Sequence, residues 1–193
     1  LSLRKKNIYI DDKDREAINR LLERYNFKEG DILIGVSPSC RSPIKEWQAD
    51  GFIEVINELL KKDNYKIVIV GDISQKGRAQ KIKDASRRGG VLDLTGKIDL
   101  NELFALVERM SVLLTCDSAC MHIASDLGVK VAAIFGPTDP KEYCPQGEND
   151  IVIRKDIKCS PCKKAVCSFN HECMKGISAG EVLGAIRRLL EPI

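Results

Sequence analysis

Two polar turns lie in the segment Thr115–Pro140, each directly after an apolar strand pattern. Asp117 to Ala119 follows the pattern at Ser111–Cys116, and Gly136 to Pro140 follows the pattern at Val131–Phe135. A helix that begins at such a turn points free backbone N–H groups and the positive end of its dipole at a bound group. We therefore predict an anion site here, of the kind that holds phosphate.

The helical pattern between these turns adds one polar candidate. Asp117 is a residue type that caps helices, and Gly128 follows the pattern at a place where a left-handed C-cap is least costly. His122 lies about one turn into this helix and is one of only two histidines. A packed or surface histidine is the more common case. A ligand contact competes with it here, because the helix starts at the predicted anion site.

A second polar loop, Ser37–Trp47, follows the first strand pattern and contains hydroxyl groups and two cations. Lys45 could reach a phosphate as a flexible point charge, and Trp47 could anchor the loop against the next helix. A solvated lysine beside a structural tryptophan is the alternative. The place of the loop, at the carboxyl end of a strand, favours a binding site.

Two further loops follow strand patterns, at Gly71-Asp72 and at Thr95–Leu100. The glycine permits a tight turn or a close ligand approach, and Asp99 is predicted to cap the next helix. Neither loop is specific alone. Because the carboxyl ends of parallel strands share one edge, the four loops together predict a nucleotide crevice.

The chain has eight cysteines, four of which fall in the segment 159–173 as CSPC, a single Cys and HEC. Cys159, Cys162, Cys167, His171 and Cys173 have spacing that resembles a zinc site, although the intervals are short for a tetrahedral knuckle. Reduced thiols that pack a loop, or one or two disulfides, are the alternatives. A mid-sized α/β chain favours reduced thiols or a metal over a disulfide scaffold.

Apolar strands alternate with amphipathic helices through the body of the chain. This order predicts right-handed crossovers and an α/β fold, a Rossmann-like doubly wound parallel sheet. Predicted strands are Ile32–Val36, Lys66–Val70, Val91–Leu94, Ser111–Cys116, Val131–Phe135 and Ile151–Ile153. Predicted helices are Asp11–Tyr25, Ala49–Lys62, Gln75–Arg88, Leu100–Met110, Ser118–Asp126 and Ala179–Leu190.

The composition narrows the classes of protein that need to be considered. The 193 residues are 44% hydrophobic and 31% charged, which is typical of a globular domain. A net charge of +3, with basic and acidic residues mixed, gives no argument for nucleic acid. No apolar run approaches the roughly 20 residues of a membrane span. A basic face could touch an anionic membrane, but solvated helix surfaces are the favoured interpretation.

Taken together, the motifs resemble glycosyltransferase family 9, the ADP-heptose:lipopolysaccharide heptosyltransferases. The matching features are SPS…IKEW, VGD, LTGKIDLNEL, the block DSACMHIASDLGVKVAAIFGPTDP and the tail CSPC…C…HECM. The resemblance implies a GT-B enzyme with two facing Rossmann-like domains, of which this chain would be the C-terminal, donor-binding one. Residues 1–30 would be a connector helix after the interdomain crossover, and residues 31–193 the nucleotide-sugar domain.

The resemblance also implies an activity. Such enzymes move heptose from ADP-heptose to the lipopolysaccharide inner core, with inversion and without a metal, at the cytoplasmic face of the inner membrane. The acceptor site and catalytic base would belong to an N-terminal domain outside this sequence. A different sugar or acceptor, or a non-catalytic nucleotide- or metal-binding module, remains the alternative.

Lys45 would neutralise the departing ADP phosphates, and the family's usual glycine and carboxylate are replaced here by Ala119 and Gln75. No metal ligands are expected, and peripheral association with the membrane is a further expectation. The residues that would hold the donor are Ser39, Lys45, Gln75, Lys97, Ile98, Asp117, Ser118, Ala119, His122, Gly136 and Thr138.

Overall fold

The computed structural model describes residues 8–86 and 90–191. A six-stranded sheet forms its centre, with the strand order β3-β2-β1-β4-β5-β6 and every neighbouring pair parallel. The predicted parallel sheet is therefore confirmed. The strands are β1 Ile32–Ser37, β2 Tyr65–Ile69, β3 Val91–Asp93, β4 Val112–Cys116, β5 Lys130–Phe135 and β6 Ile151–Arg154.

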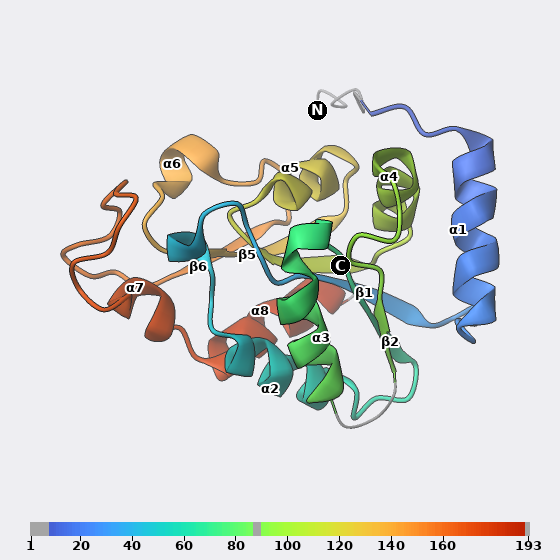
Figure 1. The fold of residues 1–193 in the computed structure, drawn as a ribbon, viewed down its shortest axis with the longest axis horizontal. Helices are drawn as coiled ribbons and strands as arrows, with labels where there is room; N and C mark the ends of the chain where they lie inside the picture. The colour runs from blue at the N-terminus through green and yellow to red at the C-terminus, as the bar shows by residue number, and fades with distance from the viewer. Residues whose placement is uncertain (1–7, 87–89, 192–193) are drawn as a thin grey trace.

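Helices cover both faces of the sheet, as Figure 1 shows with the sheet seen nearly edge-on. One face carries α2 (Ala49–Leu59), α3 (Lys76–Asp84) and α8 (Ala179–Leu190). The other carries α1 (Asp12–Arg24), α4 (Leu100–Glu108) and α5 (Ala119–Asp126). Shorter elements lie in the connections: η1 Pro43–Lys45, η2 Ile73–Gln75, α6 Pro140–Tyr143 and α7 Glu172–Lys175.

Two apolar cores result, one on each side of the sheet. Side chains alternate along each strand, so Ile34 enters the core under α2, α3 and α8 while Leu33 enters the core under α1, α4 and α5. Because both faces are covered, the strands are continuous apolar runs, and this is why they were visible in the sequence. The α1 residues Ile18 and Leu22 are buried in the second core.

Helix α1 packs on α4 at the edge of the domain, where Arg15 Nε lies 2.7 Å from Glu108 Oε2. The helix predicted at Asp11–Tyr25 is therefore confirmed, with the bounds Asp12–Arg24. The further interpretation of residues 1–30 as an interdomain connector stays a prediction.

The point where the strand order changes direction lies between β1 and β4. The chain runs from β1 outward through β2 to β3, and then returns to place β4 on the other side of β1. The two strands are in register up to their ends, with Ser37 beside Thr115. In open α/β sheets, ligands bind outside the carboxyl ends of the strands at such a switch point.

Several predicted helix ends were wrong. Helix α2 stops at Leu59 rather than Lys62, α4 at Glu108 rather than Met110, and α3 begins at Lys76, after the separate turn η2. α3 ends at Asp84, and the predicted end at Arg88 lies outside the described residues. Leu60 and Met110 lie beyond these helix ends and are still buried in the two cores, so the apolar pattern continues past the last helical residue.

Candidate functional site

A cleft of about 820 Å³ opens at the carboxyl end of the sheet, at the switch point. Its walls come from the loops after β1, β2, β3 and β4, so four of the five turns that the sequence singled out converge, and the turn at Gly136 to Pro140 does not line the cleft. Eight of the eleven predicted donor residues line the cleft: Ser39, Lys45, Gln75, Ile98, Asp117, Ser118, Ala119 and His122.

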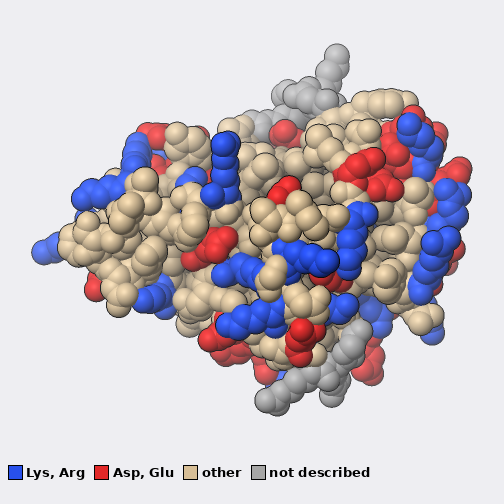
Figure 2. Space-filling model, in the orientation of Figure 1, with Lys and Arg blue, Asp and Glu red and all other residues tan. Residues whose placement is uncertain are grey.

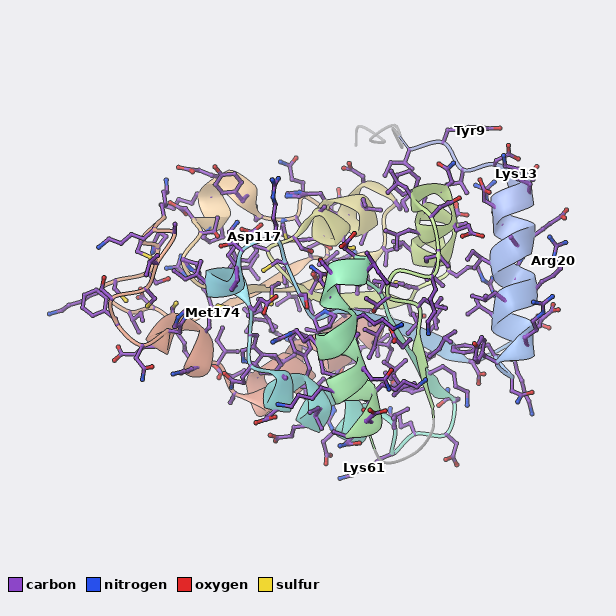
Figure 3. The ribbon with its side chains drawn as sticks, in the orientation of Figure 1. Tyr9, Lys13, Arg20, Lys61, Asp117 and Met174 are labelled. Atoms are coloured by element: carbon purple, nitrogen blue, oxygen red, sulfur yellow. The ribbon has the colours of Figure 1, made fainter. Side chains whose placement is uncertain are left out.

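The shortest polar contact in the cleft joins Lys45 to Asp117. Lys45 Nζ lies 2.7 Å from Asp117 Oδ2, and the two side chains are 32% and 8% exposed. Asp117, which Figure 3 labels, directly follows β4, and Lys45 is the last residue of the short helix η1. The pair fixes the ammonium group at the mouth of the cleft, and it joins residues that are 72 positions apart in the chain.

The predicted role of Asp117 as a helix cap is wrong. The N-cap of α5 is Ser118, which makes no side-chain capping bond, and its Oγ lies 2.9 Å from Thr115 Oγ1 instead. Asp117 is held by Lys45, because an ion pair with a partly buried lysine outweighs a local hydrogen bond. The start of α5 is consequently left without a side-chain cap inside the cleft, which is the arrangement that suits an anion.

Ser39 supplies an independent sign of a missing partner. It is 4% exposed, it lines the cleft, and its Oγ is buried without a hydrogen-bond partner among the described residues. A buried hydroxyl without a partner costs roughly 1–3 kcal/mol. A ligand oxygen in the cleft would supply the missing bond.

The other end of the cleft is apolar. Ile73 is 59% exposed and Leu100 is 58% exposed, and both line the cleft together with Ile98 and Leu103. Gly96 brings the loops that carry them together: its φ is +65°, and a Cβ there would lie 2.7 Å from the Cα of Ile73. Exposed aliphatic side chains on two facing loops form a surface that suits a flat, weakly polar group such as a base.

Gln75, a predicted donor residue, and its neighbour Asp72 both line the cleft and both cap η2. Gln75 Oε1 accepts a hydrogen bond from the Asp72 N–H at 3.1 Å, so this carbonyl caps η2. Asp72 Oδ1 accepts from the Ser74 N–H at 2.9 Å, and this backbone bond lowers the pKa of Asp72 below its usual value. Asp72 thus lines the cleft as the N-cap of η2. The sequence contains one signal for this acid, because Asp72 directly follows Gly71 after the second strand.

Three predicted residues do not line the cleft. Lys97 Nζ donates to the Asp93 carbonyl at 2.6 Å, and Thr138 is 7% exposed. A Cβ on Gly136 would lie 2.3 Å from Met174 Sδ, and the Gly136 carbonyl accepts from Ser160 Oγ at 2.6 Å. The turn after β5 is thus packed against the cysteine segment. Donor contacts by Lys97, Gly136 and Thr138 stay predictions without support from this geometry.

The cysteine segment forms a small unit of its own. Cys159, Cys162, Cys167 and Cys173 all line one cavity of about 20 Å³. All eight cysteines are free thiols, and burial, followed by the neighbouring thiols, raises the pKa of Cys173. Across the described ranges, no cluster of three or more His, Cys, Asp or Glu side chains is arranged to hold a metal ion. Of the interpretations left open by the sequence, reduced thiols that pack a loop fit this arrangement.

The surface carries no large area of one charge on the face seen in Figure 2, where basic and acidic side chains are interspersed. None of the helices in residues 8–86 and 90–191 is long and apolar enough to cross a membrane.

The doubly wound parallel sheet, with its cleft at the switch point, defines a Rossmann-like α/β domain. A family model narrows this class. It is described as glycosyltransferase family 9 (heptosyltransferase) and matches residues 3–172, so the chain belongs to this family. The resemblance seen in the sequence is confirmed.

Individual relatives agree with this family. Lipooligosaccharide heptosyltransferase 2 of Campylobacter jejuni is 29% identical over 178 residues, which cover 86% of this chain and 54% of the relative. Lipopolysaccharide heptosyltransferase 3 of Escherichia coli is 27% identical, over 83% of this chain and 47% of that protein. The chain therefore spans about half the length of the curated relatives it matches.

Solved structures give the same picture. The family 9 glycosyltransferase of Veillonella parvula superposes with a TM-score of 0.86 at 28% identity, over 95% of this chain and 53% of that one. The E. coli ADP-heptose lipopolysaccharide heptosyltransferase II gives a TM-score of 0.78 at 20% identity, also over 95% and 53%. At that identity the second match supports the fold alone.

Proposed function

We propose that this chain is the donor-binding part of an inverting glycosyltransferase that moves heptose from ADP-heptose to a lipopolysaccharide inner-core acceptor. The observation that carries the proposal is the meeting of Lys45, Asp117 and the uncapped start of α5 in one cleft. A cation and a helix start that converge on one volume form a site for a diphosphate.

In the proposed complex the diphosphate lies against the start of α5. Lys45 stabilises the negative charge that grows on ADP as the sugar leaves, which is an electrostatic contribution to catalysis. The Ser39 hydroxyl gains the partner that it lacks among the described residues. His122, which is exposed and lines the same cleft, lies on α5 within reach of the donor's polar groups.

The apolar end of the cleft receives the adenine in this proposal. Ile73, Ile98 and Leu100 present aliphatic surface there, and Asp72 offers an ionised carboxylate for the ribose hydroxyls. Gln75 is a weaker candidate for the ribose, because its carbonyl already caps η2.

The acceptor site and the catalytic base are proposed to belong to a second, N-terminal domain. This agrees with the coverage of about half of each relative. We further propose that the enzyme needs no metal, works at the cytoplasmic face of the inner membrane with peripheral association, and has no nucleic-acid partner. Asp117 is engaged by Lys45 rather than free to bind a cation, which supports metal independence.

ADP is expected to raise the melting temperature of the protein more than UDP does. At a hundredfold excess over the dissociation constant, ligand binding adds about 2.7 kcal/mol, or roughly 5–10 °C for a domain of this size. The measurement is a thermal melt with each nucleotide in the presence of EDTA, because metal-independent binding is part of the proposal. Equal shifts with both nucleotides would contradict adenine recognition. Stoichiometric bound metal without nucleotide binding would favour the metal-binding alternative.

Replacing Gly96 with alanine is expected to lower stability by about 1–3 kcal/mol and to weaken ADP binding as well. The added Cβ would strain a positive φ and press on the backbone of Ile73, so the apolar end of the cleft must open. Urea unfolding and calorimetric titration with ADP measure the two effects. Gly128→Ala is the matched control, since Gly128 has φ +77° with nothing within 4 Å of the added Cβ. Gly128→Ala should lose stability but keep its affinity for ADP. Unchanged ADP affinity in Gly96→Ala would count against the assigned base position.

A further inference from the structure

The loop that carries Lys45 has little regular structure of its own. Between the end of β1 and the start of α2 it contains a single turn of 3-10 helix, η1. The backbone bonds within it run from the Lys45 N–H to the Ser42 carbonyl at 3.0 Å and from the Glu46 N–H to the Pro43 carbonyl at 3.1 Å. These bonds fix the turn itself. They do not fix where the turn stands above the sheet.

One side chain from outside the loop joins its two ends. Arg78, on α3, donates from Nε to the Pro38 carbonyl at 3.0 Å and from Nη2 to the Trp47 carbonyl. Its Nη1 also lies 3.4 Å from Glu46 Oε2. Glu46 in turn accepts from the Cys40 N–H through Oε1 at 3.4 Å. A planar guanidinium can bind several acceptors at once, so one arginine closes the loop.

Arg78 is outside the cleft lining, whereas Lys45 points into it toward Asp117. The side chains of Arg78 and Glu46 are only 24% and 22% exposed, so their ion pair is partly shielded from water. Charge-assisted bonds to backbone carbonyls are also stronger than neutral ones. Holding a catalytic cation in place before the ligand arrives reduces the ordering cost of binding.

We propose that Arg78 is a positioning residue that holds the Lys45 loop in its binding geometry. This inference rests on the proposed function, since it concerns how the same site binds a nucleoside diphosphate. The guanidinium acts through the backbone of residues 38–47 and not by touching the ligand. What matters is therefore the forked shape of Arg78 and not its charge alone.

The test compares Arg78→Ala and Arg78→Lys with the unaltered chain by calorimetric titration with ADP at fixed ionic strength. Loss of this network is expected to weaken ADP binding about tenfold in both variants, because lysine keeps the charge but cannot reach three acceptors. Lys81→Ala is the matched control: Lys81 lies on the same helix, is 64% exposed, and pairs with Asp50 at 3.7 Å. Its affinity should stay within about twofold of the unaltered chain.

A double variant separates positioning from an independent contribution. If Arg78 acts through Lys45, then Lys45→Ala combined with Arg78→Ala should bind ADP no more weakly than Lys45→Ala alone. Full additivity of the two changes would overturn the proposal. Normal affinity in Arg78→Lys would overturn it as well, because charge alone would then explain the effect.

Backbone hydrogen exchange without nucleotide tests the same proposal directly. In both Arg78 variants the amides of Lys45, Glu46 and Trp47 should exchange faster, while those of β1 and β4 should keep their rates, which also reports that the fold is intact. Unchanged exchange at these three amides would overturn the positioning role. If the unaltered chain fails to bind ADP, the proposed function fails, and the exchange rates still decide whether Arg78 holds the loop.

Discussion

Lys45→Ala is expected to weaken ADP binding by roughly thirtyfold, which corresponds to about 2 kcal/mol. The substitution removes the ammonium group that faces the cleft and leaves Asp117, 8% exposed, without its 2.7 Å partner. An unpaired carboxylate beside the proposed diphosphate repels it, so the loss exceeds that of a simple surface charge. Calorimetric titration with ADP, below the melting temperature of the variant, measures the effect.

Two further variants give this prediction its controls. Lys45→Ala combined with Asp117→Asn should recover part of the lost affinity, because the repulsion is relieved while the cation stays absent. Lys61→Ala should leave affinity unchanged, since Lys61 pairs with Glu58 on α2 and lies far from Asp117 in Figure 3. If Lys45→Ala leaves the affinity for ADP unchanged, the phosphates do not bind at Lys45 and the prediction is contradicted.

The helices that are easiest to predict from sequence are those in which capping residues and an apolar stripe mark the same boundaries. Helix α8 was predicted at Ala179–Leu190, as observed, and the structure shows that Ser178 and Glu181 form a capping box at its start. Asp99 and Glu102 form the same kind of cap on α4. By contrast, α6 and α7 have four residues each, which is too short to show a helical period.

The cleft was predictable from topology, because the carboxyl ends of parallel strands must share one edge. The partners of single residues within it were not. Local propensity makes Asp117 a cap, and only the folded chain brings Lys45 beside it. The sequence likewise shows that Gly136 permits a close approach, but not that Met174 would be the group that approaches. Tertiary contacts decided both cases.

The cysteine segment shows a second limit of sequence reasoning. Its spacing allowed metal, disulfide and reduced-thiol interpretations, since all three use the same residue types. Cys167 Sγ accepts hydrogen bonds from the backbone N–H groups of Phe169 at 3.3 Å and His171 at 3.2 Å. Asn170 and His171 both have positive φ angles in this turn. Because neither is a glycine, the left-handed backbone leaves no mark in the sequence.

Trp47→Ala is expected to lower the free energy of unfolding by about 3–5 kcal/mol, the largest stability effect that we predict for a single substitution. The Trp47 ring is fully buried, lies edge-on to Phe52 at 5.0 Å between centroids, and donates from Nε1 to the Ile177 carbonyl at 3.0 Å. Gly51 leaves the space that the ring fills, since a Cβ there would lie 2.4 Å from Trp47 Cζ2. Urea unfolding followed by circular dichroism measures the loss, because the chain has no other tryptophan to report by fluorescence.

Trp47→Phe separates packing from the hydrogen bond. Phenylalanine keeps most of the apolar contact but leaves the Ile177 carbonyl without the indole N–H, so a smaller loss of about 1–3 kcal/mol is expected. Trp47→Ala keeps the backbone carbonyl that accepts from Arg78 but removes the ring that anchors the Lys45 loop, so this variant should bind ADP more weakly even where it is fully folded. A loss below about 1 kcal/mol for Trp47→Ala would contradict this account. It would mean that the Lys45 loop is held in place without its tryptophan anchor.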